Sequence, residues 1–323
     1  MREPKWSFPD SLQPAATDVG FDLARALDAV VLLRSEIPAD GFTAGMLGTE
    51  RGGYGVVIRE DGLVLTIGYL ITEAQTIWLT SNRGALIGGY PLAYDQASGF
   101  GLVQPLGKLD ATMLVRGSSA TAQPGDEAYV IGHGGINHAL KTRITAKREF
   151  AGYWEYVLDE ALFTSPAHPQ WGGAALVDRE GKLIGLGSLL VQEQRGEETV
   201  NANMFVPIDL LEPILHSMLT TGRPPHAPRP WLGMYTQESE GQLIVGGLAP
   251  GGPAERAGVQ VGDRVRGVGA ERAADLAGLF RMVWRQGDAG VEVPLVVARK
   301  GDVLRITARS ADRNDLLKKP NLH

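Results

Sequence analysis

The chain has 323 residues, 44% of them hydrophobic and 21% charged, with a formal net charge of −6 at pH 7. This length suffices for about two domains with buried cores, and the composition is typical of a globular protein. The acidic balance, without a long basic run, argues against a general nucleic-acid-binding protein. Cysteine is absent, which excludes disulfides, thiol catalysis and cysteine-based zinc sites.

The stretch 1–17 reads as a polar, proline-bearing N-terminal extension. It contains no apolar core and no cleavage-type site, so the chain is expected to be cytoplasmic. A chain from which a signal peptide had been removed would look the same, and a periplasmic location is therefore the alternative. No apolar run elsewhere is long enough to cross a bilayer, so no membrane span is expected.

The stretch 18–221 has the pattern of many short strands. A helical pattern from Asp18 runs into an apolar, β-branched stretch that ends near Leu33. Two hairpins are predicted where apolar runs flank a short turn ending in glycine, at 60–62 and at 179–181. Other short apolar runs lie between them, and YWEYVLDE is among those expected to be strands. Strands at this regular spacing, with few helices, predict a β-barrel or a pair of barrels.

A second, smaller domain is predicted at 231–309. The segment 222–230 contains four prolines and is expected to be a stiff linker. Beyond it, short apolar runs alternate with two helical patterns, GGPAERAG and DLAGLFRMVWRQ, before a last hairpin. This mixture predicts a small α+β unit. The stretch 310–323 is a C-terminal tail without a packing pattern of its own.

Four motifs in this order of elements resemble one family. They are GYGVVIREDGLVLT, GGAALVDREGKLIG, NMFVPIDLL and VGGLAPGGPAERAGVQVGDRV. The chain is similar over 18–309 to the HtrA/Deg-type trypsin-like serine proteases. The resemblance implies a mainly β fold, a trypsin-like double β-barrel followed by a PDZ domain. It also implies a homo-oligomer, a trimer in this family, and the apolar Trp6, Phe8 and Leu12 of the N-terminal extension are candidates for such contacts.

The catalytic motifs of the family are altered in this chain. Where the family has L-T-N-x-H-V-V, the chain has LTIGYLI, which puts Tyr69 in the position of the catalytic His. DQASGFGLV puts Gly99 in the position of the Asp, and QWGGAAL puts Gly172 in the position of the Ser. Gln170 replaces a glycine that the family uses at its oxyanion hole. The resemblance therefore implies a pseudoprotease, a family member without a catalytic triad.

The chemistry of these side chains supports that interpretation. Acyl transfer by a triad needs a nucleophile, a base in hydrogen-bond reach and an acid that orients the base. A tyrosine, with a pKa near 10, is a poor base at neutral pH, and two glycines supply neither a hydroxyl nor a carboxylate. We expect a protein without peptidase activity, cofactor or metal that acts as a binding or scaffolding module. The alternative is a serine endopeptidase or other hydrolase with a relocated active site.

Residues near the altered motifs are candidates for a relocated active site. Ser165 and His168 share a loop, and His133 and His138 lie in IGHGGINHA, so a new catalytic pair or a metal site could be built from them. We favour the interpretation that the histidines are structural and that SPAHP is a turn. Trp171 is either an aromatic lid over the altered site, which we favour, or a wall for peptide binding.

The PDZ segment retains the features that peptide capture requires. The partners expected are peptides or protein C-termini, held by backbone N–H groups, a strand edge and an apolar pocket beside a helix. By resemblance, WLGM is the carboxylate-binding loop. The apolar helix positions at spacings of three and four form one stripe, which serves the domain core, the groove or both. The candidate peptide-binding residues are Trp231, Leu232, Gly233, Met234, Leu276, Leu279, Phe280 and Val283.

Overall fold

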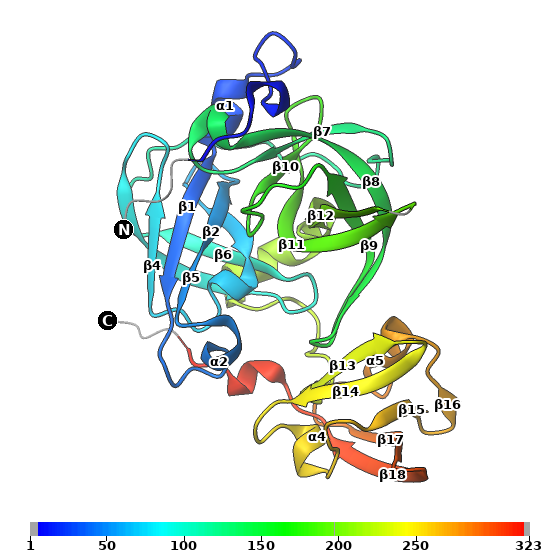
Figure 1. The fold of residues 1–323 in the computed structure, drawn as a ribbon. Helices are drawn as coiled ribbons and strands as arrows, with labels where there is room; N and C mark the ends of the chain where they lie inside the picture. Colours follow the sequence, from blue (N-terminus) through cyan, green and yellow to red (C-terminus); the bar gives the residue numbers. More distant parts are fainter. Residues whose placement is uncertain (1–5, 197, 320–323) are drawn as a thin grey trace. The chain divides into compact units, whose positions relative to one another are not determined.

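The computed structural model describes residues 6–196 and 198–319, whose strands form two closed barrels and a separate sheet (Figure 1). Contacts divide the chain into two units. The first contains the chain up to Arg148, Glu160–Pro225 and the residues from Lys318 onward. The second contains Glu149–Asp159 and His226–Leu317, so it includes the tip of a hairpin from within the range expected for the first domain. The prediction of a mainly β chain is confirmed.

The first barrel is closed by antiparallel strands in the order β1-β2-β3-β6-β5-β4. The hairpin predicted at 60–62 joins β2 to β3, with Val57 opposite Val64. Alternate side chains of β1 point into a core that contains Val31 and Leu33, as expected for a strand with one buried face. The strands are β1 (Val30–Glu36), β2 (Glu50–Val57), β3 (Val64–Ile67), β4 (Thr76–Thr80), β5 (Leu86–Tyr94) and β6 (Phe100–Pro105).

The second barrel has the order β10-β11-β12-β9-β8-β7. Its strands are β7 (Glu127–Ile131), β8 (Ala139–Gly152), β9 (Tyr156–Ser165), β10 (Ala175–Val177), β11 (Leu183–Arg195) and β12 (Glu198–Pro207). The prediction that YWEYVLDE is one strand is wrong at its start. Tyr153–Glu155 form the turn between β8 and β9, because Glu155 has a left-handed backbone, with φ of 63°, that a strand cannot contain.

The helices of the first unit are short. They are η1 (Asp10–Leu12), α1 (Leu23–Asp28), α2 (Ala44–Leu47), η2 (Gly68–Leu70), η3 (Gly135–His138), η4 (Ile208–Leu210) and α3 (Glu212–Thr221). Asp22 caps α1 by accepting a hydrogen bond from the Arg25 N–H.

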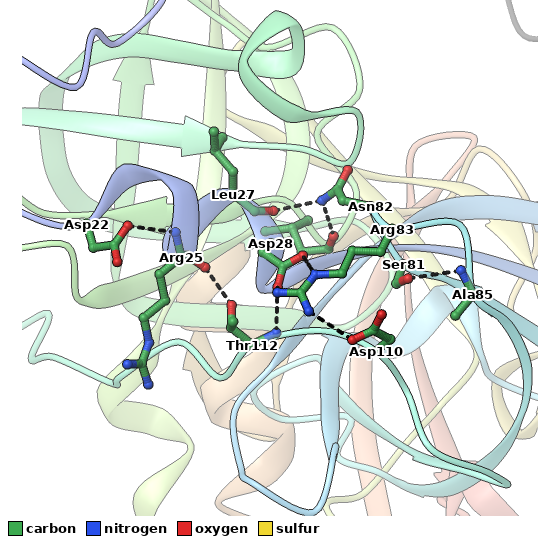
Figure 2. A network of polar contacts seen from close by, with 11 residues as sticks. Asp22, Arg25, Leu27, Asp28, Ser81, Asn82, Arg83, Ala85, Asp110 and Thr112 are labelled. Carbon is green, nitrogen blue, oxygen red and sulfur yellow. Dashed lines mark hydrogen bonds and ion pairs between the residues drawn. The ribbon is translucent and has the colours of Figure 1, made fainter.

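A polar network ties α1 to the turn between β4 and β5 (Figure 2). Arg83 makes ion pairs with Asp28 at 2.8 Å and Asp110 at 2.9 Å. The Asn82 amide donates to the carbonyls of Leu27 and Val30. Its carbonyl oxygen accepts from the Gly134 N–H, just before η3. The network therefore joins the first barrel to a loop of the second.

The second unit is built on a sheet of order β13-β14-β15-β17-β18, in which β16 pairs with β15. Its elements are β13 (Met234–Ser239), β14 (Gln242–Leu248), α4 (Pro253–Arg256), β15 (Arg264–Val268), β16 (Glu271–Arg272), α5 (Leu276–Trp284), β17 (Glu292–Arg299), β18 (Asp302–Arg309) and η5 (Arg313–Leu316). Asp275 caps α5. The apolar stripe of α5 packs into the core of this unit, which also contains Leu232 and Met234. No helix among the described residues is both long and apolar enough to cross a membrane.

The C-terminal tail is more ordered than its sequence indicates. Ala311 forms a bridge with Trp231, and 313–316 fold into η5. In the first unit, the backbone N–H of Lys318 donates to Glu73 at 2.9 Å. These contacts use backbone groups, so no hydrophobic pattern in the sequence could predict them.

Candidate functional site

The residues at the three altered triad positions lie together in the first unit. A Cβ built on Gly172 would be 2.8 Å from the Tyr69 hydroxyl. The Gly99 carbonyl accepts a hydrogen bond at 2.7 Å from the N–H of Gly68, the neighbour of Tyr69. Elements distant in sequence, η2, the turn before β6 and the loop before β10, therefore meet at one place. This is the arrangement that the motif comparison implies.

Tyr69 occupies the space beside Gly172, which the motif comparison aligns with the serine of the family. Its hydroxyl donates to the Ser188 carbonyl at 2.9 Å, so its proton is already engaged. Burial of the hydroxyl raises the pKa of Tyr69 further above its usual value, opposed by a hydrogen bond with the Trp171 side chain. A phenol with a raised pKa stays protonated at neutral pH and does not act as a base.

The position of the triad acid has no carboxylate. Gly99 has a left-handed backbone, with φ of 83°, which glycine adopts at lower cost than aspartate does. The nearby Asp95 is buried and accepts hydrogen bonds from the N–H of Ser98 at 2.8 Å and from its hydroxyl at 2.6 Å. Asp95 therefore stabilises its own turn.

The backbone of the loop before β10 is used for internal contacts. The Gln170 N–H, which occupies one position of the family's oxyanion hole, donates to Nδ1 of His168 at 3.1 Å. The Gly173 N–H donates to the Gly187 carbonyl at 2.8 Å. The Gln170 side chain accepts a hydrogen bond from the Tyr54 hydroxyl. The Gln170 N–H, already paired inside the protein, is not presented to an oxyanion.

His168 has a structural environment. Its side chain is fully buried, and burial lowers the pKa of His168 to about 4, so the ring is neutral at pH 7. Because Nδ1 accepts from Gln170, the ring proton is on Nε2, which lies 3.2 Å from the His138 carbonyl. Both ring nitrogens are committed, which leaves neither to activate Ser165. Ser165 instead lines an open hollow of about 690 Å³ that also includes Arg143.

The N-terminal extension packs on the same chain. Trp6 contacts the rings of His138 and His168, with centroids 4.4 and 5.5 Å away, and Phe8 also contacts His168, at 5.1 Å. Two of the aromatic residues considered for contacts between copies thus cover the loop before β10. Within residues 6–196 and 198–319, no group of three or more His, Asp or Glu side chains is placed to hold a metal, so His133 is not part of one.

Trp171 lies next to Tyr69 and is partly exposed. This position is compatible with both hypotheses for it, an aromatic lid over the altered site and a wall for peptide binding. Its carbonyl accepts from the Ala174 N–H at 3.0 Å, which holds the tight turn that carries Gly172 and Gly173. A Cβ on Gly173 would be 1.9 Å from the Tyr54 carbonyl oxygen. The close approach of two backbones therefore requires glycine at 173.

The candidate peptide-binding residues lie in the second unit. Leu276, Leu279, Phe280 and Val283 are at most 7% exposed and belong to the core cluster that contains Leu232 and Met234. Gly233 has a φ of 69°, and its neighbours Leu232 and Met234 direct their N–H groups to one place. The acceptor there is the carboxylate of Glu155, from the turn between β8 and β9.

Sequence reasoning missed Glu155. The signal was present, since a charged residue stands between aromatic residues in GYWEYV. The run was interpreted as a strand, and only the folded chain places its carboxylate at the loop 231–234.

Comparison with known proteins identifies two domains in this chain. A family model of the trypsin-like peptidase domain matches 53–186, and a model of the PDZ domain matches 230–309. The serine endoprotease DegS of Haemophilus influenzae is 21% identical over 264 residues, which cover 79% of this chain and 75% of DegS. The chain carries a trypsin-like peptidase domain and a PDZ domain, as the HtrA-type proteases that it resembles do. The resemblance inferred from the motifs is thus confirmed.

Other HtrA-type relatives are similarly distant. A probable periplasmic serine endoprotease DegP-like of Halomonas elongata is 24% identical over 81% of this chain, and the match spans 57% of that relative's length. Among solved structures, the HtrA-type protease AlgW with a tripeptide has a TM-score of 0.53 at 19% identity, covering 93% of this chain and 97% of that one. The serine endoprotease from Yersinia pestis has a TM-score of 0.52 at 19% identity, covering 89% and 95%. These likenesses concern the fold.

Proposed function

We propose that this HtrA-type protein has no peptidase activity and acts by binding peptides or protein C-termini through its PDZ domain. The observation that carries the proposal is the Tyr69 hydroxyl, which stands 2.8 Å from the Cβ position of Gly172. A phenol that donates to a backbone carbonyl fills the place where a nucleophile and its base would have to meet. The names of the relatives, serine endoproteases, describe an activity for which this chain lacks the His, Asp and Ser side chains at the matching positions.

The first expected result is that Gly172→Ser does not create a peptidase. The new hydroxyl would face Tyr69, which cannot accept its proton, and triad members act as a unit rather than additively. Casein turnover and labelling by a fluorophosphonate probe should stay at the level of the unmodified protein. Labelling or turnover in the unmodified protein that is lost on replacing Ser165 or His168 would support the alternative, a relocated active site.

Restoring the catalytic residues at all three positions is a stronger test of the proposed absence of peptidase activity. In the variant Tyr69→His, Gly99→Asp, Gly172→Ser, the aspartate must adopt the left-handed backbone of Gly99, and the Gln170 N–H remains paired with His168. We expect cleavage to remain undetectable or at least about 10³-fold below that of a trypsin-like protease. Efficient cleavage by the single variant Gly172→Ser would contradict the proposal.

The peptide-binding part of the proposal is tested at Gly233. A Cβ there would lie 2.7 Å from the Trp231 ring, so Gly233→Trp should disrupt the loop and weaken binding of apolar C-terminal peptides at least about tenfold from a micromolar level. Gly241→Trp is the matched control, because Gly241 has a similar φ, 68°, with nothing within 4 Å of its Cβ. Enrichment of the same peptides from a library by Gly233→Trp would place the binding site elsewhere.

A further inference from the structure

The loop 231–234 already holds a carboxylate of this chain. An oxygen of Glu155 accepts hydrogen bonds from the N–H of Leu232 at 3.0 Å, and the N–H of Met234 lies 3.0 Å from the other oxygen. The Glu155 residue is 7% exposed. A buried carboxylate surrounded by backbone donors is the arrangement by which a nest of N–H groups captures a C-terminal carboxylate.

Tyr153, two positions before Glu155, also forms a hydrogen bond with this part of the second unit. β13 is the edge strand of its sheet, with β14 on one side only. On its other side, the N–H of Thr236 donates to the carbonyl of Tyr153 at 3.2 Å. Glu155 thus meets Met234 while Tyr153 meets Thr236, so the turn runs antiparallel to β13. Peptides added to an exposed strand edge make backbone bonds of this kind.

Side chains of the turn also make specific contacts. The rings of Tyr153 and Tyr235 meet edge to face, with centroids 6.2 Å apart. Val157 is 7% exposed and is buried in the cluster that contains Leu232 and Phe280. One short segment therefore supplies a carboxylate, a strand partner and an apolar side chain, the three elements of a PDZ ligand.

The backbone of the turn is strained in a way that packing alone does not require. Glu155 has φ of 63°, a conformation that glycine or asparagine adopts at lower cost at the last position of a three-residue hairpin loop. A glycine would relieve the strain and remove the carboxylate. The glutamate is therefore explained by the donors that it meets.

We propose that the segment Tyr153-Trp154-Glu155 is an internal ligand of the PDZ groove. A partner peptide must displace it, with its C-terminal carboxylate on the N–H groups of Leu232 and Met234. The favoured peptide ends in a residue of the size of valine, in place of Val157, and has an aromatic residue two positions earlier, in place of Tyr153. This inference rests on the proposed peptide-binding function and adds what controls access to the groove.

The test uses the full chain and a labelled hexapeptide that ends in Tyr-Trp-Val with a free carboxylate, with the C-terminal amide of the same peptide as the ligand control. Glu155→Gly removes the carboxylate and suits the left-handed backbone, so folding is retained. Glu155→Ala is a second variant. Glu160→Gln is the matched protein control, because Glu160 is an exposed carboxylate of β9 that pairs with Lys147.

We expect both Glu155 variants to bind the acid peptide at least about tenfold more tightly than the unmodified protein and Glu160→Gln do, with little binding of the amide. Hydrogen exchange at the Leu232 and Met234 amides, measured without peptide, should be at least about tenfold faster in Glu155→Gly.

The two readouts separate the possible failures. If the unmodified protein and Glu155→Gly bind the peptide equally, the groove is open and the internal ligand is refuted. If amide exchange at Leu232 and Met234 is unchanged in Glu155→Gly, the contact itself is refuted. If exchange accelerates but no protein binds the peptide, the internal contact stands and the peptide-binding function, with the partner named above, is overturned.

Discussion

The equilibrium constant for opening the PDZ carboxylate loop should rise about tenfold for each pH unit between about 5 and 7 and should then level off. Burial raises the pKa of Glu155 from 4.5 to about 7, opposed by the N–H donors of Leu232 and Met234 and by the charge of Arg313. Tyr235 also faces this group, and burial raises the pKa of its phenol, so that phenol stays neutral over this range.

The direction in which the opening constant changes with pH follows from proton binding. A released Glu155 in water has its ordinary pKa, so between about 4.5 and 7 the closed state holds a proton that the open state lacks. The closed state is therefore most stable below about pH 4.5 and loses stability as the pH rises through 7. At 1.36 kcal/mol per pKa unit, the full change is about 3 kcal/mol.

Amide exchange at Leu232 and Met234, corrected for the intrinsic exchange rate at each pH, measures this equilibrium. Glu155→Gln is the matched variant, because it keeps the size of the side chain and cannot titrate. Its opening constant should be nearly independent of pH. A closed state that becomes more stable as the pH rises from 5 to 7 would contradict the assignment of the proton to Glu155.

Gly173→Ala should lower the free energy of unfolding of the barrels by about 3 kcal/mol or more. The new Cβ would lie 1.9 Å from the Tyr54 carbonyl oxygen, so a backbone must move, and Gly173 has a φ of 78° that alanine adopts only with strain. The loss should appear as a lower urea midpoint for the first unit with an unchanged m-value.

The adjacent Gly172→Ala is the matched control. Its Cβ would meet only the end of the Tyr69 side chain within 3 Å, and that side chain can shift, so a loss of about 1 kcal/mol is expected. Equal losses at 172 and 173 would show that contact with Tyr69 is as unyielding as contact with the Tyr54 backbone. In that case Tyr69 would be a rigid part of the site rather than a side chain filling space.

The sequence by itself indicated the mainly β fold, the resemblance to HtrA-type proteases and the motif positions of Tyr69, Gly99 and Gly172. Each of these depends on local patterns: alternating apolar residues, glycine at the end of hairpin turns, and short motifs in a fixed order. The convergence of Tyr69 and Gly172 was also implied, because a shared fold brings the same motif positions together.

Only the tertiary structure decided how the remaining polar groups are used. Whether the nitrogens of His168 are available, and where the Gln170 N–H donates, depends on strands that are distant in sequence. The same holds for Glu155, whose donors are 77 and 79 residues away and are backbone N–H groups. Since every non-proline residue carries that group, no side-chain pattern in the sequence can predict which ones a buried carboxylate will find.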